Sequence, residues 1–198
     1  MNIANILNIL IFAVPLFWLG VILVSWFKTR ELDLKLIKRG VLIVIALFIL
    51  QGAYLTIATY NAWKLDPMSR YLLPPHNTWY FASYAYFHFW RPEVVNLFVG
   101  TIWAGFLFLI NKFSQERFFE KSDIYLAFFT AFVVGWPKFF AYLAIAFGLL
   151  TLKGIINAII LKDKSRLALT TSIALSALVV AGFGNLIMKL QFFDNLKL

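Results

Sequence analysis

The sequence contains no cysteine and only nine acidic residues among its 198 positions. The absence of cysteine excludes disulfide bonds, thiolate metal sites and a cysteine nucleophile. Charged residues make up 14% of the chain, which is about half of their usual share in soluble domains, and 62% of the residues are apolar. A chain of this length cannot bury so much apolar surface in one water-soluble core. The composition therefore predicts an integral membrane protein.

Long apolar runs account for this composition and predict membrane-spanning helices. A run of about 20 residues matches the thickness of the hydrocarbon core of a bilayer. Such runs cover residues 3–27, 40–62, 94–110, 137–161 and 167–188, and a shorter apolar run covers residues 123–136. No segment alternates with the period of two that membrane strands need. We expect an all-α polytopic transmembrane helix bundle of six to seven helices. It forms a single integral-membrane domain over residues 1–198, with two N-terminal spans in 1–62.

Basic residues exceed acidic ones by nine, and their distribution predicts the topology. Residues 28–39 join the first two runs and carry five basic and two acidic side chains. The positive-inside rule places this loop in the cytoplasm and the N-terminus outside. The lipid bilayer is the expected partner of the basic side chains. Nucleic acid is excluded, because the chain has no polar basic domain.

An aromatic segment at residues 78–90 leaves two alternatives open. Thirteen residues reach only about 20 Å as a helix, so the segment is short for a complete span. Tryptophan and tyrosine favour the headgroup level, which would suit an interfacial or re-entrant helix that ends at Arg91-Pro92-Glu93. His88 fits an aromatic belt, because His76 is the one other histidine and the pair makes a poor metal site. We expect no metal and no cofactor.

Asp66 ends the second apolar run, and Arg70 follows it by four residues. In the simpler interpretation, Asp66 is a helix-end carboxylate beside an arginine. In the alternative, it is one of two carboxylates that share a proton and activate a water molecule. Asp123 is the natural second member of such a pair. Ser122 and Asp123 are also good residues for capping the start of a helix.

Two groups of residues resemble the motifs of a known family of membrane enzymes. In type IV prepilin peptidases and archaeal preflagellin peptidases, an aspartate precedes an arginine and an Ile/Leu-Pro-Asn turn; this chain has Asp66, Arg70, Leu73-Pro74 and Asn77. The second family motif is Gly-x-Gly-Asp followed by an apolar helix, which Asp123, Leu126 and Gly135 resemble. Glu120 and Ser122 replace the two glycines of that motif. The similarity covers about residues 55–190, so residues 63–190 would form a peptidase-like core.

The resemblance implies an intramembrane aspartyl endopeptidase in an active or a diverged, inactive form. Asp66 and Asp123 would be the catalytic pair, with Arg70 and Glu120 in supporting positions. The substrates would be pilin-like proteins that carry short basic leader peptides, cleaved at the cytoplasmic face of a prokaryotic plasma membrane. The main alternative is a non-catalytic multi-pass subunit that acts as a scaffold or assembly partner of other membrane subunits. A transporter is a third hypothesis, since Gly135-Trp136-Pro137 could interrupt a helix.

Overall fold

The computed structural model describes residues 3–29, 31–114, 120–156 and 169–187, which form helices and no strand. The helices are α1 (Ile3–Thr29), α2 (Leu34–Leu65), η1 (Ser69–Leu72), α3 (Thr78–Ala85), η2 (Tyr86–Trp90), α4 (Arg91–Phe113), α5 (Lys121–Val134), α6 (Phe139–Ile156) and α7 (Leu169–Ile187). Four of the helical stretches are long and apolar enough to cross a membrane. The predicted all-α class of membrane protein is confirmed to this extent. The parts of the predicted runs at 157–161, 167–168 and 188 lie outside the described residues.

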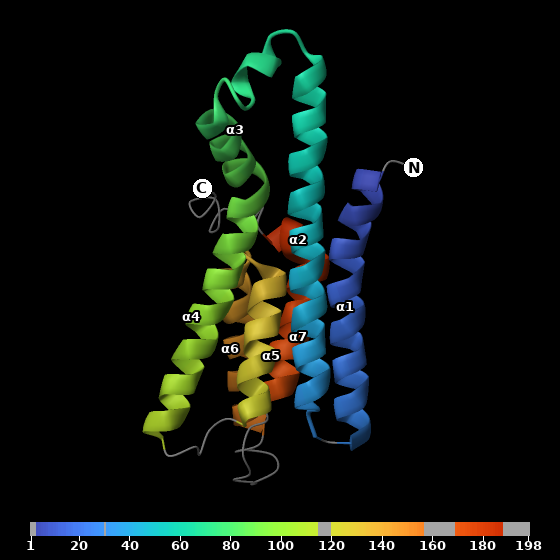
Figure 1. Cartoon of the computed structure of the whole chain (residues 1–198). Helices are drawn as coiled ribbons and strands as arrows, with labels where there is room; N and C mark the ends of the chain where they lie inside the picture. The colour runs from blue at the N-terminus through green and yellow to red at the C-terminus, as the bar shows by residue number, and fades with distance from the viewer. Residues whose placement is uncertain (1–2, 30, 115–119, 157–168, 188–198) are drawn as a thin grey trace.

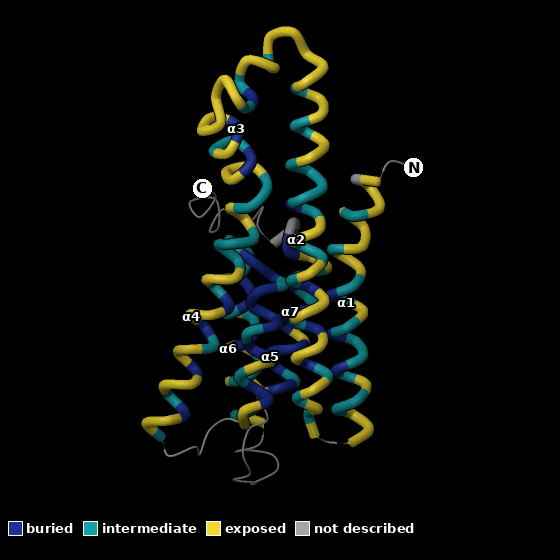
Figure 2. Tube along the Cα trace, in the orientation of Figure 1, coloured by how far each residue is buried: buried dark blue, intermediate teal, exposed yellow. Residues whose placement is uncertain are grey.

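Helix α5 lies at the centre of the arrangement (Figure 1). It contacts α2, α4, α6 and α7, while α1 packs on the outside against α2 and α7. Buried residues concentrate on α5 and on the faces that surround it (Figure 2). The fully buried side chains include Phe129 of α5, Tyr142 of α6 and Ile173 of α7. A hydrogen bond of 2.9 Å between the hydroxyls of Thr130 and Tyr142 links α5 to α6 inside this core.

The aromatic segment at 78–90 is the beginning of a longer helix, which corrects the predicted short helix. Helices α3, η2 and α4 run without interruption through the 36 residues Thr78–Phe113. Proline removes one helical hydrogen bond, and its ring clashes with a carbonyl of the preceding turn. The wider π-helical turn of η2 lies directly before Arg91-Pro92 and accommodates the proline. Residues 78–113 therefore cross the molecule once, as one continuous helix. If residues 78–90 had been a span of their own, this part of the chain would have crossed twice.

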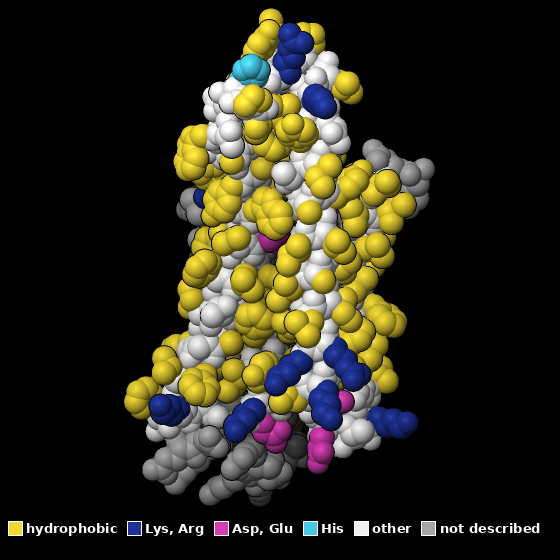
Figure 3. All heavy atoms as spheres, in the orientation of Figure 1, with side chains coloured by type: hydrophobic (Ala, Val, Ile, Leu, Met, Phe, Trp, Pro, Cys, Tyr) yellow, Lys and Arg dark blue, Asp and Glu magenta, His cyan; other side chains and the backbone are white. Residues whose placement is uncertain are grey.

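The two ends of the molecule differ in charge and in thickness. Lysine and arginine side chains gather at the end where α2 and α5 begin and where α4 ends (Figure 3). At the opposite end, the last part of α2 with η1, α3 and η2 extends beyond the other helices (Figure 1). We call residues 60–90 the projecting hairpin and the lysine-rich end the basic end. The 32 residues of α2 make a helix about 48 Å long, whereas the hydrocarbon core of a bilayer measures about 30 Å.

Ring contacts hold the two arms of the projecting hairpin together. The Trp63 ring of α2 lies 5.6 Å from the ring of Phe81 and 4.8 Å from that of Tyr84, both on α3. At the base of the hairpin, the Trp90 indole packs against Gly52 of α2, where a Cβ atom would lie only 3.1 Å from the ring. The same indole donates a hydrogen bond of 3.2 Å to the Thr56 hydroxyl. The hairpin is therefore joined to the spanning helices through α2 and Trp90.

Candidate functional site

Asp66 lies at the tip of the projecting hairpin, where it caps the C-terminal end of α2. Its carboxylate is exposed and accepts a hydrogen bond of 2.7 Å from the Ser69 backbone N–H. Hydrogen bonds from Ser69, first from its side chain and then from its backbone, lower the pKa of Asp66. The Arg70 guanidinium donates to the Tyr71 hydroxyl at 3.1 Å and stacks on the Tyr71 ring. Asp66 therefore acts as a local turn-forming residue.

Asp123 lies in the first turn of α5, at the basic end, and is buried. It forms a capping box with Glu120, in which each side chain accepts a hydrogen bond from the backbone N–H of the other residue. The Thr170 hydroxyl of α7 donates a hydrogen bond to the second oxygen of the Asp123 carboxylate. Glu120 also accepts a hydrogen bond from the Ser122 hydroxyl. The predicted capping role of Asp123 is present, and Thr170 extends it to a contact between α5 and α7.

The structure does not bring Asp66 and Asp123 together. The Nζ atom of Lys38, near the start of α2, lies 5.1 Å from the centre of the Tyr125 ring, two residues after Asp123. Asp66 caps the other end of α2, 28 positions after Lys38, which corresponds to about 42 Å along the helix. In this arrangement the two carboxylates cannot contact one water molecule, as the predicted catalytic pair requires. The separation follows from the single passage of α3, η2 and α4, which puts the two motifs at opposite ends.

A buried acidic group of a different kind lies where α4 meets the turn between α5 and α6. Asn96 accepts a hydrogen bond of 2.9 Å from the Trp136 backbone N–H and hydrogen-bonds the carboxylate of Glu93. The second oxygen of Glu93 is buried and has no hydrogen-bond partner among the residues that the structure describes. Gly135 has a φ of +66° and lies so close to Asn96 that a Cβ atom would be 2.6 Å from its side-chain oxygen. This cluster fixes the α5–α6 turn onto α4.

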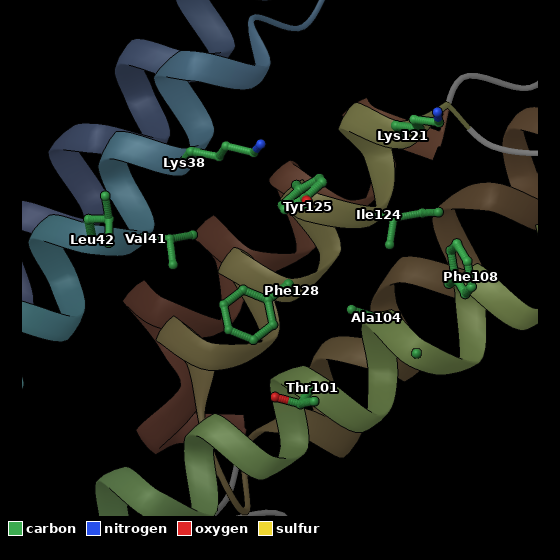
Figure 4. A pocket seen from close by; sticks show the side chains of 11 residues that line it. Lys38, Val41, Leu42, Thr101, Ala104, Phe108, Lys121, Ile124, Tyr125 and Phe128 are labelled. Carbon is green, nitrogen blue, oxygen red and sulfur yellow. The ribbon is translucent and has the colours of Figure 1, made fainter.

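Between α2, α4 and α5, nearer the basic end, the described residues enclose a cavity of about 690 Å³ (Figure 4). Its walls are mainly apolar and include Val41 of α2, Ala104 of α4 and Phe128 of α5. Lys38 and Lys121 lie at the same end of the cavity, on opposite sides of Tyr125, and Thr101 lies at the other end (Figure 4). The volume lies within the range of about 300–1,000 Å³ that is common for sites of single small ligands. The cavity is a candidate for a binding site on the part of the chain that the structure describes.

Sequence reasoning missed the Glu93 cluster and the cavity for separate reasons. Glu93 was expected to end a short helix at the membrane surface, while the continuous helix places it between helices. The spacing of Asn96 from Glu93, one helical turn, could have indicated a polar cluster on one face of a span. Lys38 belongs to the basic segment 28–39 that predicts the topology, and no role was predicted for Lys121. Their shared cavity depends on the packing of α2 beside α5, which cannot be read from two residues that lie 83 positions apart in the sequence.

Comparisons of this chain with protein-family models, with curated proteins and with solved structures give no match. The resemblance to prepilin and preflagellin peptidases therefore stays a prediction from short motifs.

Proposed function

We propose that the protein is a non-catalytic multi-pass membrane subunit that acts as a scaffold in a larger assembly. In this proposal the projecting hairpin binds an apolar surface of another protein on the outer side of a prokaryotic plasma membrane. The observation that carries the proposal is the exposure of large apolar side chains on a hairpin that extends past the thickness of a bilayer. The basic end then faces the cytoplasm, as the positive-inside rule predicts.

Charged side chains support this position in the bilayer. Lys112 ends α4 at the basic end, and Arg91 begins the same helix. The 21 positions between them correspond to about 32 Å of helix, close to the thickness of the hydrocarbon core at about 30 Å. Both cations then reach headgroup level, since long basic side chains near span ends extend toward the interface. The projecting hairpin lies beyond Arg91 and thus outside the hydrocarbon.

Exposed apolar side chains have a different meaning on the hairpin than on the spans. Leu65, Met68 and Trp79 are 85%, 85% and 82% exposed. Lipid tails cover an apolar side chain on a spanning helix, such as Phe17 of α1. Beyond the headgroups, a contiguous apolar patch in water indicates a surface for protein contact. In this proposal the protein partner covers Leu65, Met68 and Trp79 at the tip of the hairpin.

The polar groups of the described residues support a non-catalytic protein. Asp66 and Asp123 serve as caps at opposite ends of the molecule, and Arg70 and Glu120 remain beside their sequence neighbours. Peptidase activity on leader peptides would require a rearrangement that carries one aspartate across about 42 Å. The peptidase hypothesis from the sequence is the alternative against which the scaffold proposal is tested.

Site-specific photo-crosslinking in native membranes tests the proposal. A photoreactive amino acid at Trp79 should give one protein adduct of defined mass. The same group at Phe17, which is also exposed but lies on a spanning helix, should react with lipid. Replacing Leu65 and Met68 by serine should abolish the adduct at position 79 without changing the amount of folded protein. Lipid adducts at position 79, or protein adducts at both positions, would contradict a hairpin-specific partner.

A further inference from the structure

The cavity between α2, α4 and α5 has a structural origin in small residues of α4. Gly100 packs closely on α5, since a Cβ atom there would lie 3.2 Å from the Phe128 carbonyl oxygen. Five positions later, a Cβ atom on Gly105 would have no neighbour within 4 Å. Ala104 and Gly105 both line the cavity. Helix α4 is thus tight against α5 at Gly100 and leaves unfilled space toward the basic end.

The two lysines give this space one cationic end. Lys38 comes from α2 and Lys121 from α5, and the Lys38 ammonium lies over the Tyr125 ring. Among the described residues, the Asp33 carboxylate caps α2 by accepting from the Lys35 backbone N–H, and Glu120 and Asp123 form the capping box of α5. The cavity therefore combines an apolar body with two ammonium groups at headgroup level.

The volume of the cavity favours a lipid chain over a helix of another protein as its occupant. A helix of about 10 Å diameter would fill a volume of 690 Å³ within about 9 Å of length, which is less than two turns. A flexible hydrocarbon chain does not need a straight space of fixed diameter, so it can follow the cavity from Lys121 toward Thr101. Its polar head would then remain near the lysines, where bilayer headgroups lie.

We propose that the cavity between α2, α4 and α5 binds one anionic phospholipid, with an acyl chain along α4 and its phosphate at the end of the cavity that Lys38 and Lys121 line. The site lies at the basic end and is independent of the projecting hairpin and of its partner. A zwitterionic lipid satisfies the apolar walls equally well but carries its own cation close to the two ammonium groups. The lysines therefore select for net negative charge.

Native mass spectrometry of the full chain, released from mixed phosphatidylglycerol and phosphatidylcholine nanodiscs, tests the proposal. The wild-type protein should retain one phosphatidylglycerol molecule in preference to phosphatidylcholine. In the variant K38Q/K121Q, the dissociation constant for phosphatidylglycerol should rise about 10- to 30-fold, because each lysine near a headgroup contributes on the order of 1 kcal/mol. The variant K35Q/K112Q is the matched control, because it removes the same charge from exposed positions at the same end outside the cavity.

A second variant tests the apolar part of the cavity. A Cβ atom at Gly105 would meet nothing within 4 Å, so we expect the variant Gly105→Leu to fold as the wild type does, to place its side chain in the cavity and to lose the retained lipid while both lysines remain. Equal loss of phosphatidylglycerol in K38Q/K121Q and K35Q/K112Q would overturn the proposal, since it would show general surface attraction. Equal retention of both lipids by the wild type, or undiminished retention by Gly105→Leu, would overturn it as well.

Discussion

The projecting hairpin and the helices around α5 are both rich in aromatic residues, but they use them differently. Around α5, rings such as those of Phe129 and Tyr142 are fully buried among side chains from several helices. In the hairpin, Trp63, Phe81 and Tyr84 form a cluster between two arms only, and Trp79 remains exposed. The comparison shows that aromatic content does not by itself report burial. The burial of an aromatic ring depends on the number of helices that meet at its position.

The same difference predicts two levels of stability. A region with few buried apolar contacts opens at a lower free energy than a core in which many helices meet. The hairpin should therefore exchange its amide hydrogens faster than α5 while the spanning helices stay folded. Substitutions at the α5–α6 turn, at Gly52 beside Trp90, and at Asp66 and Asp123 can distinguish the stability of the hairpin from that of the helices around α5.

The largest effect is expected from Gly135→Ala at the α5–α6 turn. A side chain there would have to adopt a φ of +66° and would meet the Asn96 side chain at 2.6 Å. Strain in this backbone region costs up to about 3 kcal/mol, so the free energy of unfolding in detergent micelles, followed by circular dichroism, should fall by about that amount. Gly148→Ala in α6 is the control, because a Cβ atom there meets nothing within 4 Å. Equal effects of both substitutions would contradict the close fit of the turn.

Gly52→Leu should separate the hairpin from the spanning helices. The new side chain would displace the Trp90 indole, which lies 3.1 Å from the Cβ position and donates to the Thr56 hydroxyl. Overpacking of this kind costs about 1–3 kcal/mol. Amide exchange should accelerate in α3 and η2 and remain slow in α5. The control Gly20→Leu introduces the same side chain into open space on α1. Faster exchange in α5 would show that the two regions unfold as one.

Asp123→Asn should weaken the basic end by a smaller amount. The substitution disturbs the capping box with Glu120 and the hydrogen bond from Thr170. Loss of a helix cap costs about 1 kcal/mol, measured as the free energy of unfolding. Thr170→Val removes the donor on α7 and provides a double-mutant cycle, in which a coupling of zero would contradict the α5–α7 contact. Amide exchange in the hairpin should not change with either substitution.

The sequence could predict the helices because each depends on a local signal. The end of α2 at Leu65 follows from Asp66-Pro67, and the start of α5 at Lys121 follows from its capping residues. The segment at 78–90 was predicted wrongly as a separate short helix, since Arg91-Pro92 indicates a helix end unless a π-helical turn precedes it. That one difference determines on which side Asp123 lies relative to Asp66.

The candidate binding site could not be predicted from local signals. Lys38 and Lys121 share a cavity because α2 packs beside α5, and the cavity exists because α4 diverges after Gly100. Both facts are properties of helix packing, in which small residues permit a close approach without requiring one. Gly100 and Ala104 have the spacing that predicts a packing face; Gly100 contacts α5 closely, whereas Ala104 lines the cavity.

The smallest effect is expected from Asp66→Asn at the tip of the hairpin. The carboxylate is exposed, so the free energy of unfolding at neutral pH should not change measurably. Because hydrogen bonds from Ser69 lower the pKa of Asp66, the charged form favours the folded turn, and this contribution is lost as the pH falls through the folded-state pKa. The protection factor of the Ser69 amide, which corrects for the intrinsic pH dependence of exchange, should fall in acid in the wild type, and Asp66→Asn should remove that dependence.

The two aspartate variants also decide between the scaffold and the peptidase. A non-catalytic protein leaves a leader-bearing pilin-like peptide intact in vesicles, whether Asp66 and Asp123 are present or replaced by asparagine. Cleavage by the wild type that each Asp→Asn substitution abolishes would contradict the scaffold proposal. It would also require the ends of α2 and α5 to meet, because two carboxylates activate one water only within hydrogen-bond reach of it. A spin-label distance between positions 66 and 123 would then fall far below the ~42 Å expected from the length of α2.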